Sequence, residues 1–492
     1  MKKNEEYVIR ITDLGMEGEG IGKIYEEDAY PRDPTDSELA WTEKSETQES
    51  EQKGFAVFVK DAMVGDVIRV KLIKLKKNYA YGRLLEILEP SPDRVTPRCP
   101  KSRACGGCQI MEMDYSCQLT FKEGKVRNLL QRIGNVPEGS YQMLPIIGME
   151  DPYEYRNKAQ FPVGRGKDGS IVTGFYAGRT HTIIDTQHCY IQHPLNDRIV
   201  QIIKDWMKRY GIEPYDERTQ KGLVRHILTR IGKPLPDSVG QVMVCLVICG
   251  DHLPHANTLI TKLRAVEGMT SICININQEN TNVILGKEVR VLWGKPAIID
   301  TIGTLRYRIS PLSFYQVNST QTERLYQTVL EFADLKGRET VWDLYCGIGT
   351  ISLFLAQKAA RVYGVEVVPE AIADAKINAR MNQVENAEFF VGKAEEVLPR
   401  EYEQHGKRGD VLVVDPPRKG CEHSLLSCMA QMQPQKIVYV SCDPATLARD
   451  VKILGEEGYS VRKIRCVDMF PHSVHVETVV VLSRNTEQKD MI

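Results

Sequence analysis

The stretch that decides the fold covers residues 339–350 and reads Glu339-Thr340-Val341-Trp342-Asp343-Leu344-Tyr345-Cys346-Gly347-Ile348-Gly349-Thr350. It begins as a short apolar strand, turns through two glycines and runs into a predicted helix at Ile351–Lys358. This order lets a ligand approach the backbone closely at the turn. From about residue 325 the pattern alternates between helix and strand, which predicts a parallel α/β sheet.

The next predicted strand favours a ligand that carries a ribose. It covers residues 361–366 and ends in Glu366, about 20 residues after the glycines. At that spacing a carboxylate meets ribose hydroxyls in dinucleotide-binding folds. A surface glutamate and a nicotinamide site are the alternative interpretations. S-adenosylmethionine is favoured because the turn has a D-x-x-x-G-x-G pattern from Asp343 rather than G-x-G-x-x-G.

A later strand, at residues 410–414, favours methyl transfer. It ends in Asp415-Pro416-Pro417-Arg418, and a D-P-P tetrad at this place is typical of methyltransferases. Enzymes that methylate amines usually carry Tyr, Phe or Trp after the two prolines, to stack on the substrate. Arg418 stands there instead, which argues against an amine methyltransferase.

The candidate nucleophile is Cys442, in Ser441-Cys442-Asp443-Pro444 after the strand at 436–440. A lone buried cysteine is usually an inert core residue, but reacting groups of open parallel sheets lie at such strand ends. C5 of uracil is a poor nucleophile, and attack of a thiolate at C6 turns C5 into a carbanion that can accept a methyl group. A base must then remove the C5 proton so that the cysteine is eliminated.

The candidate base is Glu477, which opens the apolar strand at 478–482. A carboxylate that enters a buried strand is costly unless it is functional or well paired. The alternative is a strand-end residue that reaches solvent. His472 and His475 are further candidates for the base, although a histidine beside a strand is more often structural.

The first 92 residues predict a small β-barrel, because short strands alternate with glycine turns. Residues 26–53 are acidic and polar, and we interpret them as a solvated loop insertion. The second half of the barrel is basic, which fits either a solvated strand face or an RNA-binding surface with stacking aromatics. Its basic and aromatic residues are Lys60, Arg69, Lys71, Lys74, Lys76, Lys77, Arg83, Tyr79 and Tyr81.

Length and composition limit the number of domains, the kind of partner and the location that we expect. The chain has 492 residues, 42% of them hydrophobic, which suits about two to four domains with packed cores. The formal net charge of −1 gives no sign of a nucleic-acid partner, so such a signal must come from local patches. No apolar run reaches the length of a membrane span and no signal-peptide core is found, so we expect a cytoplasmic protein without membrane contact or an obligate protein partner.

Thirteen cysteines in a reducing compartment favour metal binding or catalysis over a disulfide framework. Three of them form a C-x5-C-x2-C pattern at Cys99, Cys105 and Cys108, and Cys189 lies far along the chain. Four thiolates suit either tetrahedral zinc or a 4Fe–4S cluster, and the spacing alone leaves both open.

Together these motifs resemble those of the bacterial uracil-5 methyltransferases of the TrmA and RumA type, particularly the branch that acts on 23S ribosomal RNA. The resemblance covers nearly the whole chain, with the motifs in family order. The motifs are Phe314-Tyr315-Gln316-Val317-Asn318, residues 343–350, Asp415-Pro416-Pro417-Arg418, residues 441–450 and His475-Val476-Glu477-Thr478.

The resemblance implies an S-adenosylmethionine-dependent enzyme that methylates C5 of a specific uridine in 23S ribosomal RNA. It assigns Cys442 as the nucleophile and Glu477 as the base. It also implies a set of residues that contact the methyl donor, namely Gln316, Tyr345, Glu366 and Asp415. Many relatives carry Asn in place of Asp443, which affects only the expected hydrogen bonding to the base.

For the cysteines, the resemblance implies a 4Fe–4S cluster with a structural or RNA-positioning role, and zinc is the runner-up. The implied ligands are Cys99, Cys105, Cys108 and Cys189, whereas Cys117 is not expected to be one. A tRNA uridine C5 methyltransferase is the closest alternative function. A non-catalytic RNA-binding iron–sulfur protein is another, against which the intact pair of Cys442 and Glu477 argues.

The expected organisation has three parts. Residues 1–92 form an OB-like barrel of the TRAM type, an RNA-binding module, with the acidic insertion at 26–53. Residues 93–325 form an α+β central domain with the metal cluster and further RNA contacts. Residues 326–492 form an α/β, Rossmann-like class I methyltransferase domain.

Overall fold

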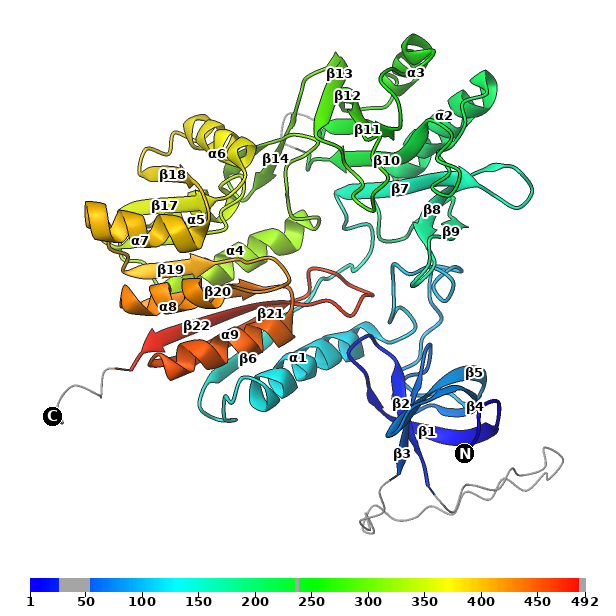
Figure 1. Cartoon of the computed structure of the whole chain (residues 1–492), viewed down its shortest axis with the longest axis horizontal. Coiled ribbons are helices and arrows are strands. Elements are labelled where there is room, and N and C mark those ends of the chain that lie inside the picture. Colours follow the sequence, from blue (N-terminus) through cyan, green and yellow to red (C-terminus); the bar gives the residue numbers. More distant parts are fainter. Residues whose placement is uncertain (26–53, 235–238, 486–492) are drawn as a thin grey trace. The chain divides into compact units, whose positions relative to one another are not determined.

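The computed structural model describes residues 1–25, 54–234 and 239–485. The predicted acidic insertion at 26–53 lies outside the described residues. The chain divides into two compact units, and their elements are labelled in Figure 1. The first unit comprises Met1–Phe121 and His472–Val474, and the second comprises Lys122–Pro471 and His475–Ile492.

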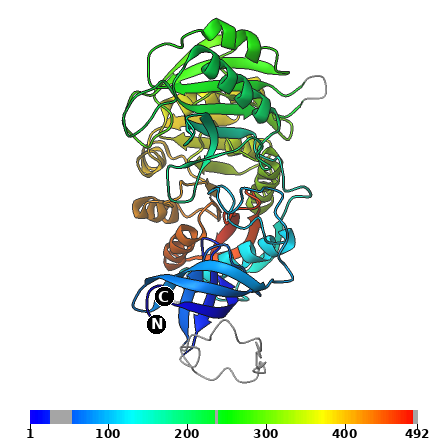
Figure 2. The same cartoon turned by 90° about the vertical axis from the view of Figure 1, so that its right-hand side faces the viewer.

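The first unit contains the predicted barrel. Five strands close in the order β1-β2-β3-β5-β4, drawn in blue in Figure 2. Buried residues alternate with more exposed ones along much of β1, β2 and β4. Gly82 is required because a Cβ there would lie 2.3 Å from a methyl carbon of Val70. The strands are β1 (Glu6–Leu14), β2 (Gly20–Ile24), β3 (Phe55–Val59), β4 (Val67–Leu75) and β5 (Tyr79–Glu89).

In the second unit, a sheet with the order β13-β12-β11-β10-β7-β8-β9 forms one layer. Helices α2 and α3 pack on it, and Trp206 of α2 and Leu259 of α3 are fully buried in their shared core. The elements are β7 (Lys158–Arg165), β8 (Ile171–Tyr176), β9 (Ile183–Asp185), β10 (Val224–Ile231), β11 (Val242–Ile248), β12 (Met269–Ile276), β13 (Glu288–Gly294), α2 (Leu195–Tyr210) and α3 (Ala256–Leu263).

The predicted parallel α/β sheet forms a second layer of this unit, in the order β18-β17-β16-β19-β20-β22-β21-β6. The pairs from β18 to β20 are parallel, β22 is antiparallel to its neighbours β20 and β21, and β6 joins the edge parallel to β21. The strands are β6 (Gln142–Ile147), β16 (Thr340–Leu344), β17 (Arg361–Glu366), β18 (Ala387–Val391), β19 (Val411–Val414), β20 (Lys436–Ser441), β21 (Tyr459–Val467) and β22 (Glu477–Arg484).

Helices cover both faces of this sheet, which is why its central strands are apolar on both sides. One core includes side chains of α4, α5 and α6, and the other includes side chains of α1, α7, α8 and α9. A hairpin of β14 (Ile298–Ile302) and β15 (Leu305–Ile309) joins the first core. The helices are α1 (Tyr115–Arg132), α4 (Ser319–Ala333), α5 (Thr350–Ala356), α6 (Pro369–Met381), α7 (Ala394–His405), α8 (His423–Gln431) and α9 (Pro444–Glu456).

Within the described ranges, no helix combines the length and the apolarity that crossing a membrane would require. The predicted domain boundary after residue 325 falls inside α4, and β6 comes from the region predicted to form the central domain. The C-terminal sheet therefore recruits elements from upstream of its own motifs.

Candidate active site

The glycine turn after β16 forms the floor of the candidate donor site. Tyr345, Gly347 and Gly349 have left-handed backbones, with φ of 69°, 54° and 82°. A bulky residue adopts this conformation only at a cost, so Tyr345 is held under strain, a common property of functional turns. A Cβ at Gly347 would meet no atom within 4 Å, so the backbone of this turn borders open space.

Glu366 is oriented toward this turn from the end of the neighbouring strand β17. Its Oε2 accepts a hydrogen bond from the backbone N–H of Gly347 at 3.2 Å, and its Oε1 accepts one from Val368 at 3.0 Å. Each carboxylate oxygen has a second lone pair that can accept a hydrogen bond from a ribose hydroxyl. The geometry therefore fits a nucleoside lying against the turn.

Two carboxyl groups with raised pKa values, one fully buried and one half-buried, fit a positively charged ligand. Burial raises the pKa of Asp343 in β16 to about 7, and Ser352 donates a hydrogen bond to one of its oxygens. The other oxygen, Oδ1, is buried without a hydrogen-bond partner among the described residues. Burial also raises the pKa of Asp415, which follows β19. A sulfonium ion nearby would stabilise the ionised form of both groups.

Three of the four residues predicted to contact the methyl donor lie at the same edge of the sheet. Tyr345, Glu366 and Asp415 end or follow the adjacent strands β16, β17 and β19. Gln316 comes from the loop before α4 and is 8% exposed. Its backbone carbonyl accepts a hydrogen bond from Asn157 Nδ2 at 2.9 Å, which ties this loop to the segment before β7.

Strand register brings Cys442 and Glu477 together. Ser441, the last residue of β20, pairs with Thr478 of β22 in an antiparallel ladder. Cys442 follows Ser441, and Glu477 precedes Thr478, so the two residues are the next opposite positions of this antiparallel pair. The predicted nucleophile and base therefore leave their strands side by side, at the edge of the sheet that also carries Asp415.

The electrostatics of this pair favour uncharged resting forms. Burial raises the pKa of the Cys442 thiol to about 12, and the negative charges of Glu477 and Asp415 add to the effect. Burial, followed by the charge of Asp415, also raises the pKa of Glu477, whose side chain is 3% exposed. Arg418 opposes both shifts. The sequence analysis used Arg418 only as an argument against amine substrates and missed the effect of its charge on Cys442 and Glu477.

Asp443 has a structural task that the sequence analysis also missed. It is the N-cap of α9, and its Oδ1 accepts hydrogen bonds from the backbone N–H groups of Ala445 at 2.9 Å and Thr446 at 3.3 Å. An Asp followed by Pro444 at the first helical position was the available signal. The cap fixes the turn that presents Cys442.

The two histidines considered as alternative bases are held in structural contacts. His472 is 2% exposed, and its ring Nδ1 lies 3.2 Å from Gln118 Nε2 within the first unit. The ring of His475 packs edge-on against Phe470, with ring centroids 6.1 Å apart. Neither contact gives these residues the strand-register relation to Cys442 that Glu477 has.

The cysteines predicted to bind a cluster are all half-buried. Cys99, Cys105 and Cys108 lie in irregular loop segments of the first unit, outside any helix or strand, whereas Cys189 belongs to the second. Across the described part of the chain, no group of three or more His, Cys, Asp or Glu side chains has an arrangement that could hold a metal ion.

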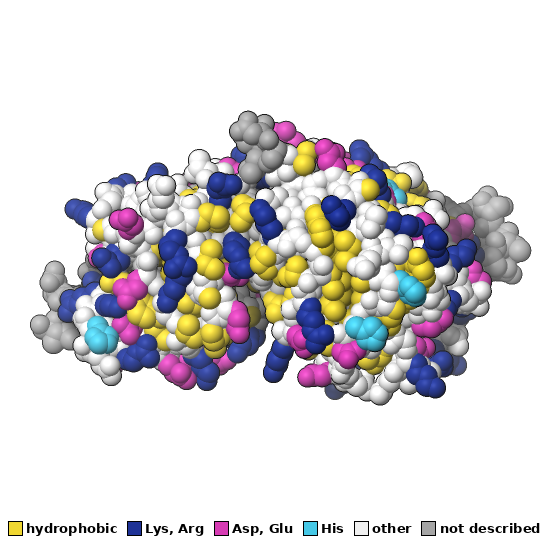
Figure 3. Space-filling model, turned by 90° about the horizontal axis from the view of Figure 1, so that it is seen from above, with side chains coloured by type: hydrophobic (Ala, Val, Ile, Leu, Met, Phe, Trp, Pro, Cys, Tyr) yellow, Lys and Arg dark blue, Asp and Glu magenta, His cyan; other side chains and the backbone are white. Residues whose placement is uncertain are grey.

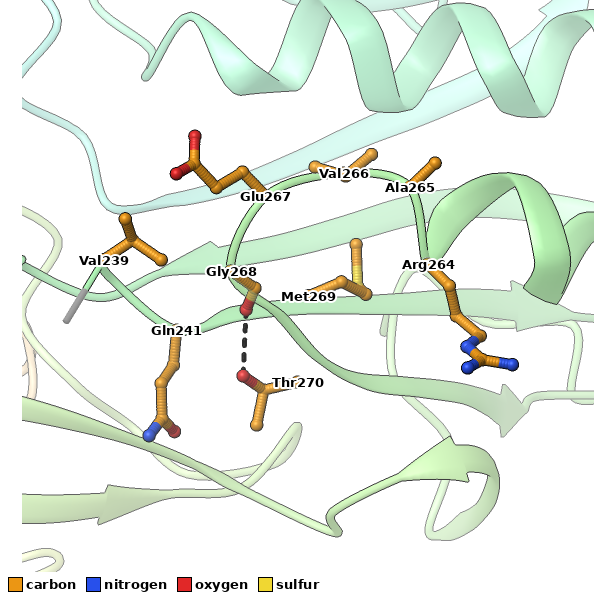
Figure 4. A pocket seen from close by; sticks show the side chains of 9 residues that line it. All are labelled: Val239, Gln241, Arg264, Ala265, Val266, Glu267, Gly268, Met269 and Thr270. Carbon is orange, nitrogen blue, oxygen red and sulfur yellow. Dashed lines mark hydrogen bonds between the residues drawn. The ribbon is translucent and has the colours of Figure 1, made fainter.

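A hollow elsewhere in the second unit does not coincide with this chemistry. Figure 4 shows a cavity of about 440 Å³ at the start of β12, where Thr270 Oγ1 donates a hydrogen bond to the Gly268 carbonyl. None of the residues predicted to bind the donor or to react lines this cavity. The candidate active site is therefore not this cavity but the place where the ends of β16, β17, β19 and β20 lie next to one another.

Comparisons with known proteins show which family this chain resembles. Residues 299–485 match the family model described as tRNA (Uracil-5-)-methyltransferase, and residues 2–85 match the TRAM domain. An uncharacterized RNA methyltransferase of Clostridium tetani is 48% identical over 490 residues, covering 99% of this chain and 98% of that protein. One from Halalkalibacterium halodurans is 46% identical over 483 residues, covering 98% of each chain.

A solved structure shares the fold. The tRNA (uracil-54, C5)-methyltransferase of Pyrococcus abyssi, crystallised with S-adenosyl-L-homocysteine, superposes with a TM-score of 0.73 at 27% identity. The match covers 97% of this chain and 99% of that one. The protein thus belongs to the S-adenosylmethionine-dependent RNA (uracil-5-)-methyltransferase family, with an N-terminal TRAM domain.

Proposed function

We propose that this enzyme methylates C5 of a specific uridine in 23S ribosomal RNA, with Cys442 as the nucleophile and Glu477 as the general base. The observation that carries the proposal is the register of β20 and β22, which brings Cys442 beside Glu477 at the sheet edge that also holds Asp415. The donor-binding residues are proposed to be Gln316, Tyr345, Glu366 and Asp415.

Each residue then has one chemical task. S-adenosylmethionine supplies an electrophilic methyl group on a sulfonium ion. The Cys442 thiolate forms a bond to C6 of the uracil, which places the negative charge on C5 and O4, and C5 takes the methyl group. Glu477 accepts the C5 proton, the electron pair of that C–H bond restores the C5–C6 double bond, and the bond between C6 and sulfur breaks to release the thiolate.

The raised pKa of Glu477 suits this task. A base with an ordinary carboxyl pKa holds a proton too weakly to remove one efficiently from carbon near neutral pH. Burial and the charge of Asp415 bring the pKa of Glu477 closer to that range. Arg418 partly offsets the raised pKa of the Cys442 thiol, which increases the thiolate fraction.

An exposed aromatic beside the site supports a nucleobase substrate. Phe314 lies two residues before Gln316 and is 74% exposed. Aromatic side chains stack on bases of any sequence, and the target uridine has to leave its own stack before C5 and C6 can be reached. An exposed ring on the loop that carries Gln316 is suited to receive it.

The barrel offers a second RNA contact within the first unit. Phe58, Tyr79 and Tyr81 form a cluster with ring centroids 5.5 to 6.0 Å apart. Of the predicted basic residues, Arg69 pairs with Glu86 and Lys71 with Glu6. The exposed ones that make no ion pair with any described residue are Lys74, Lys76, Lys77 and Arg83. These cations beside the aromatic cluster suit a phosphate backbone with stacked bases.

Elsewhere the charges are mixed. On the face seen in Figure 3, Lys and Arg side chains alternate with Asp and Glu and do not gather into one large basic field. This agrees with the net charge of −1, and it indicates that RNA affinity depends on small local patches.

We also propose that Cys99, Cys105, Cys108 and Cys189 bind a 4Fe–4S cluster. The support is the C-x5-C-x2-C pattern, and thiolate sites commonly form only together with their metal. Anaerobically purified protein should be brown and contain iron and sulfide. Colourless protein with one zinc ion would reject the cluster.

The branch assignment needs a direct comparison of substrates. A tRNA is the second candidate, because the Pyrococcus abyssi relative is a tRNA methyltransferase. The purified enzyme should be given methyl-labelled S-adenosylmethionine with unmodified 23S RNA and tRNA side by side, followed by nucleoside analysis. We expect 5-methyluridine in 23S RNA only, and methylation of tRNA alone would reject the ribosomal assignment.

A further inference from the structure

A fully buried ion pair lies close to the proposed base in the second unit. Lys122 Nζ donates a hydrogen bond to Asp468 Oδ1 at 2.6 Å, and both side chains are 0% exposed. Lys122 Nζ also donates to the carbonyl oxygen of Phe470 at 3.0 Å, and the Phe470 N–H donates to Asp468 Oδ1 at 3.3 Å. Burying two charges is expensive, so such a pair contributes more to a specific arrangement than to stability.

The pair is one residue away from the strand partner of Glu477. Asp468 directly follows Val467, the last residue of β21, and Val467 pairs with Glu477 in the ladder between β21 and β22. A displacement of Asp468 would therefore move its neighbour Val467, and Val467 is paired directly with Glu477.

Neutral hydrogen bonds hold the backbone of the same turn from other elements. Gln321 Nε2 of α4 donates to the Asp468 carbonyl at 3.1 Å, and the Asp468 N–H donates to the carbonyl of Ile147 in β6 at 2.9 Å. Asn318, the N-cap of α4, donates to the Met469 carbonyl at 3.2 Å. Lys122 provides the charged contact in this network and comes from α1.

We propose that Lys122 and Asp468 are positioning residues that fix residues 468–470 and thereby hold the Glu477 carboxylate where it can remove the C5 proton. This inference rests on the proposed function, in which Glu477 is the base. Neither residue is assigned any contact with RNA or with the methyl donor. Their effect is therefore expected on one step, the removal of the C5 proton that lets Cys442 leave.

The chemistry supplies a readout for that step. When proton removal is slow, attack by Cys442 and methyl transfer still occur, so the covalent enzyme–RNA adduct accumulates. An RNA with 5-fluorouridine at the target carries no proton at C5, so its adduct forms at a rate that does not depend on the base. Comparing the two RNAs separates a misplaced base from a generally damaged site.

The variant to test is Lys122→Met combined with Asp468→Asn. Removing one partner alone leaves a buried unpaired charge and destabilises the fold, whereas removing both charges avoids this. The amide introduced by Asp468→Asn keeps an oxygen that can accept a hydrogen bond from the Phe470 N–H. The matched control is Lys407→Met with Glu401→Gln, which removes another lysine–carboxylate pair, 3.1 Å apart, at the end of α7.

The probes are a transcript of the RNA that the wild type methylates and the same transcript with 5-fluorouridine. We expect the Lys122 and Asp468 double variant to remain folded by circular dichroism and to turn over roughly 10- to 100-fold more slowly. The ordinary transcript should accumulate adduct in denaturing gels, while the fluorinated transcript should form adduct at the wild-type rate. The control double variant should behave as the wild type in both assays.

Wild-type turnover in the double variant would overturn the inference. Equal slowing of adduct formation on the fluorinated RNA, or failure of the variant to fold, would also overturn it, because the pair would then support the whole site. Glu477→Gln, run in parallel, should accumulate the adduct. If it does not, the assignment of Glu477 fails and this inference falls with it, whereas the other outcomes overturn the inference alone.

Discussion

Two sets of thiols in this chain differ in how their surroundings are built. Cys442 leaves a central strand, beside a helix cap and across from Glu477 in a defined register. Cys99, Cys105 and Cys108 lie in irregular loop segments, where the backbone makes local hydrogen bonds such as the one that the Cys105 N–H donates to the Lys101 carbonyl at 2.8 Å. The first set of residues is positioned by paired strands and a helix cap, whereas the second lies in loops.

The difference teaches where a site can be preformed. Strand pairing fixes the backbone positions of Cys442 and Glu477 whether or not substrate is present. A site made of loop thiolates acquires its geometry together with the metal, because metal binding and local folding are coupled. The predictions below, from the largest effect to the smallest, test whether this contrast holds.

The largest effect on turnover is expected from a change of Cys442 itself. Cys442→Ala removes the proposed nucleophile, so turnover should fall by roughly 10⁴-fold or more in a methyl-transfer assay. Cys428→Ala, a change of a half-buried thiol in α8, should keep wild-type activity. Substantial methylation by the Cys442 variant would mean that the nucleophile lies elsewhere.

At the other set of thiols the effect should be smaller. Cys105→Ser is expected to lower bound iron and sulfide, and to reduce turnover by at most roughly 10- to 100-fold, since methyl transfer needs no electrons. Cys117→Ser, a change of a half-buried thiol in α1 that is not a proposed ligand, is the control and should retain the metal. Unchanged iron content in the Cys105 variant would contradict the proposed ligand set.

The electrostatic link between Cys442 and Glu477 can be measured by alkylation. Burial and the negative charge of Glu477 keep the pKa of Cys442 at about 12, so iodoacetamide should react slowly at pH 9. Glu477→Gln removes that charge, lowers the pKa of Cys442 and should speed the reaction by up to about tenfold, the effect of one pKa unit. Glu396→Gln, on the exposed side of α7, should leave the rate unchanged, and equal rates in all three proteins would refute the link.

The smallest expected effect concerns the cap that presents Cys442. Asp443→Ala should lower the free energy of unfolding by about 1 kcal/mol, because two backbone N–H groups of α9 lose their acceptor. Asp443→Asn keeps an acceptor oxygen and should change it by only a few tenths of a kcal/mol. Urea unfolding measures both values, and equal losses in the two variants would show that charge, not capping, matters at this position.

Much of the candidate active site could be predicted from the sequence because its signals are local. A glycine turn after an apolar strand and an acid at the end of the next strand mark the edge, and the structure places Tyr345 and Glu366 there. Cys442 and Glu477 also lie at strand ends. Their side-by-side register, however, depends on an antiparallel pairing that no local pattern specifies.

The parts that escaped prediction depend on contacts distant in sequence. β6 pairs with β21 across some 300 residues, and Pro145 within it weakened its strand signal, as is usual for an edge strand. Lys122 and Asp468 are 346 residues apart, so no local sequence pattern predicts that they form an ion pair. The cysteine pattern gave ligand types and spacing but no geometry, which is why zinc and iron–sulfur both remained open.

The most direct test of the central claim is mass spectrometry of the covalent intermediate. Glu477→Gln protein should be incubated with the RNA and S-adenosylmethionine, then digested with protease and nuclease. The account predicts a methylated uridine adduct on the peptide that contains Cys442. An adduct on another cysteine, or its absence while the variant still binds both substrates, would contradict the assignment of Cys442 and Glu477.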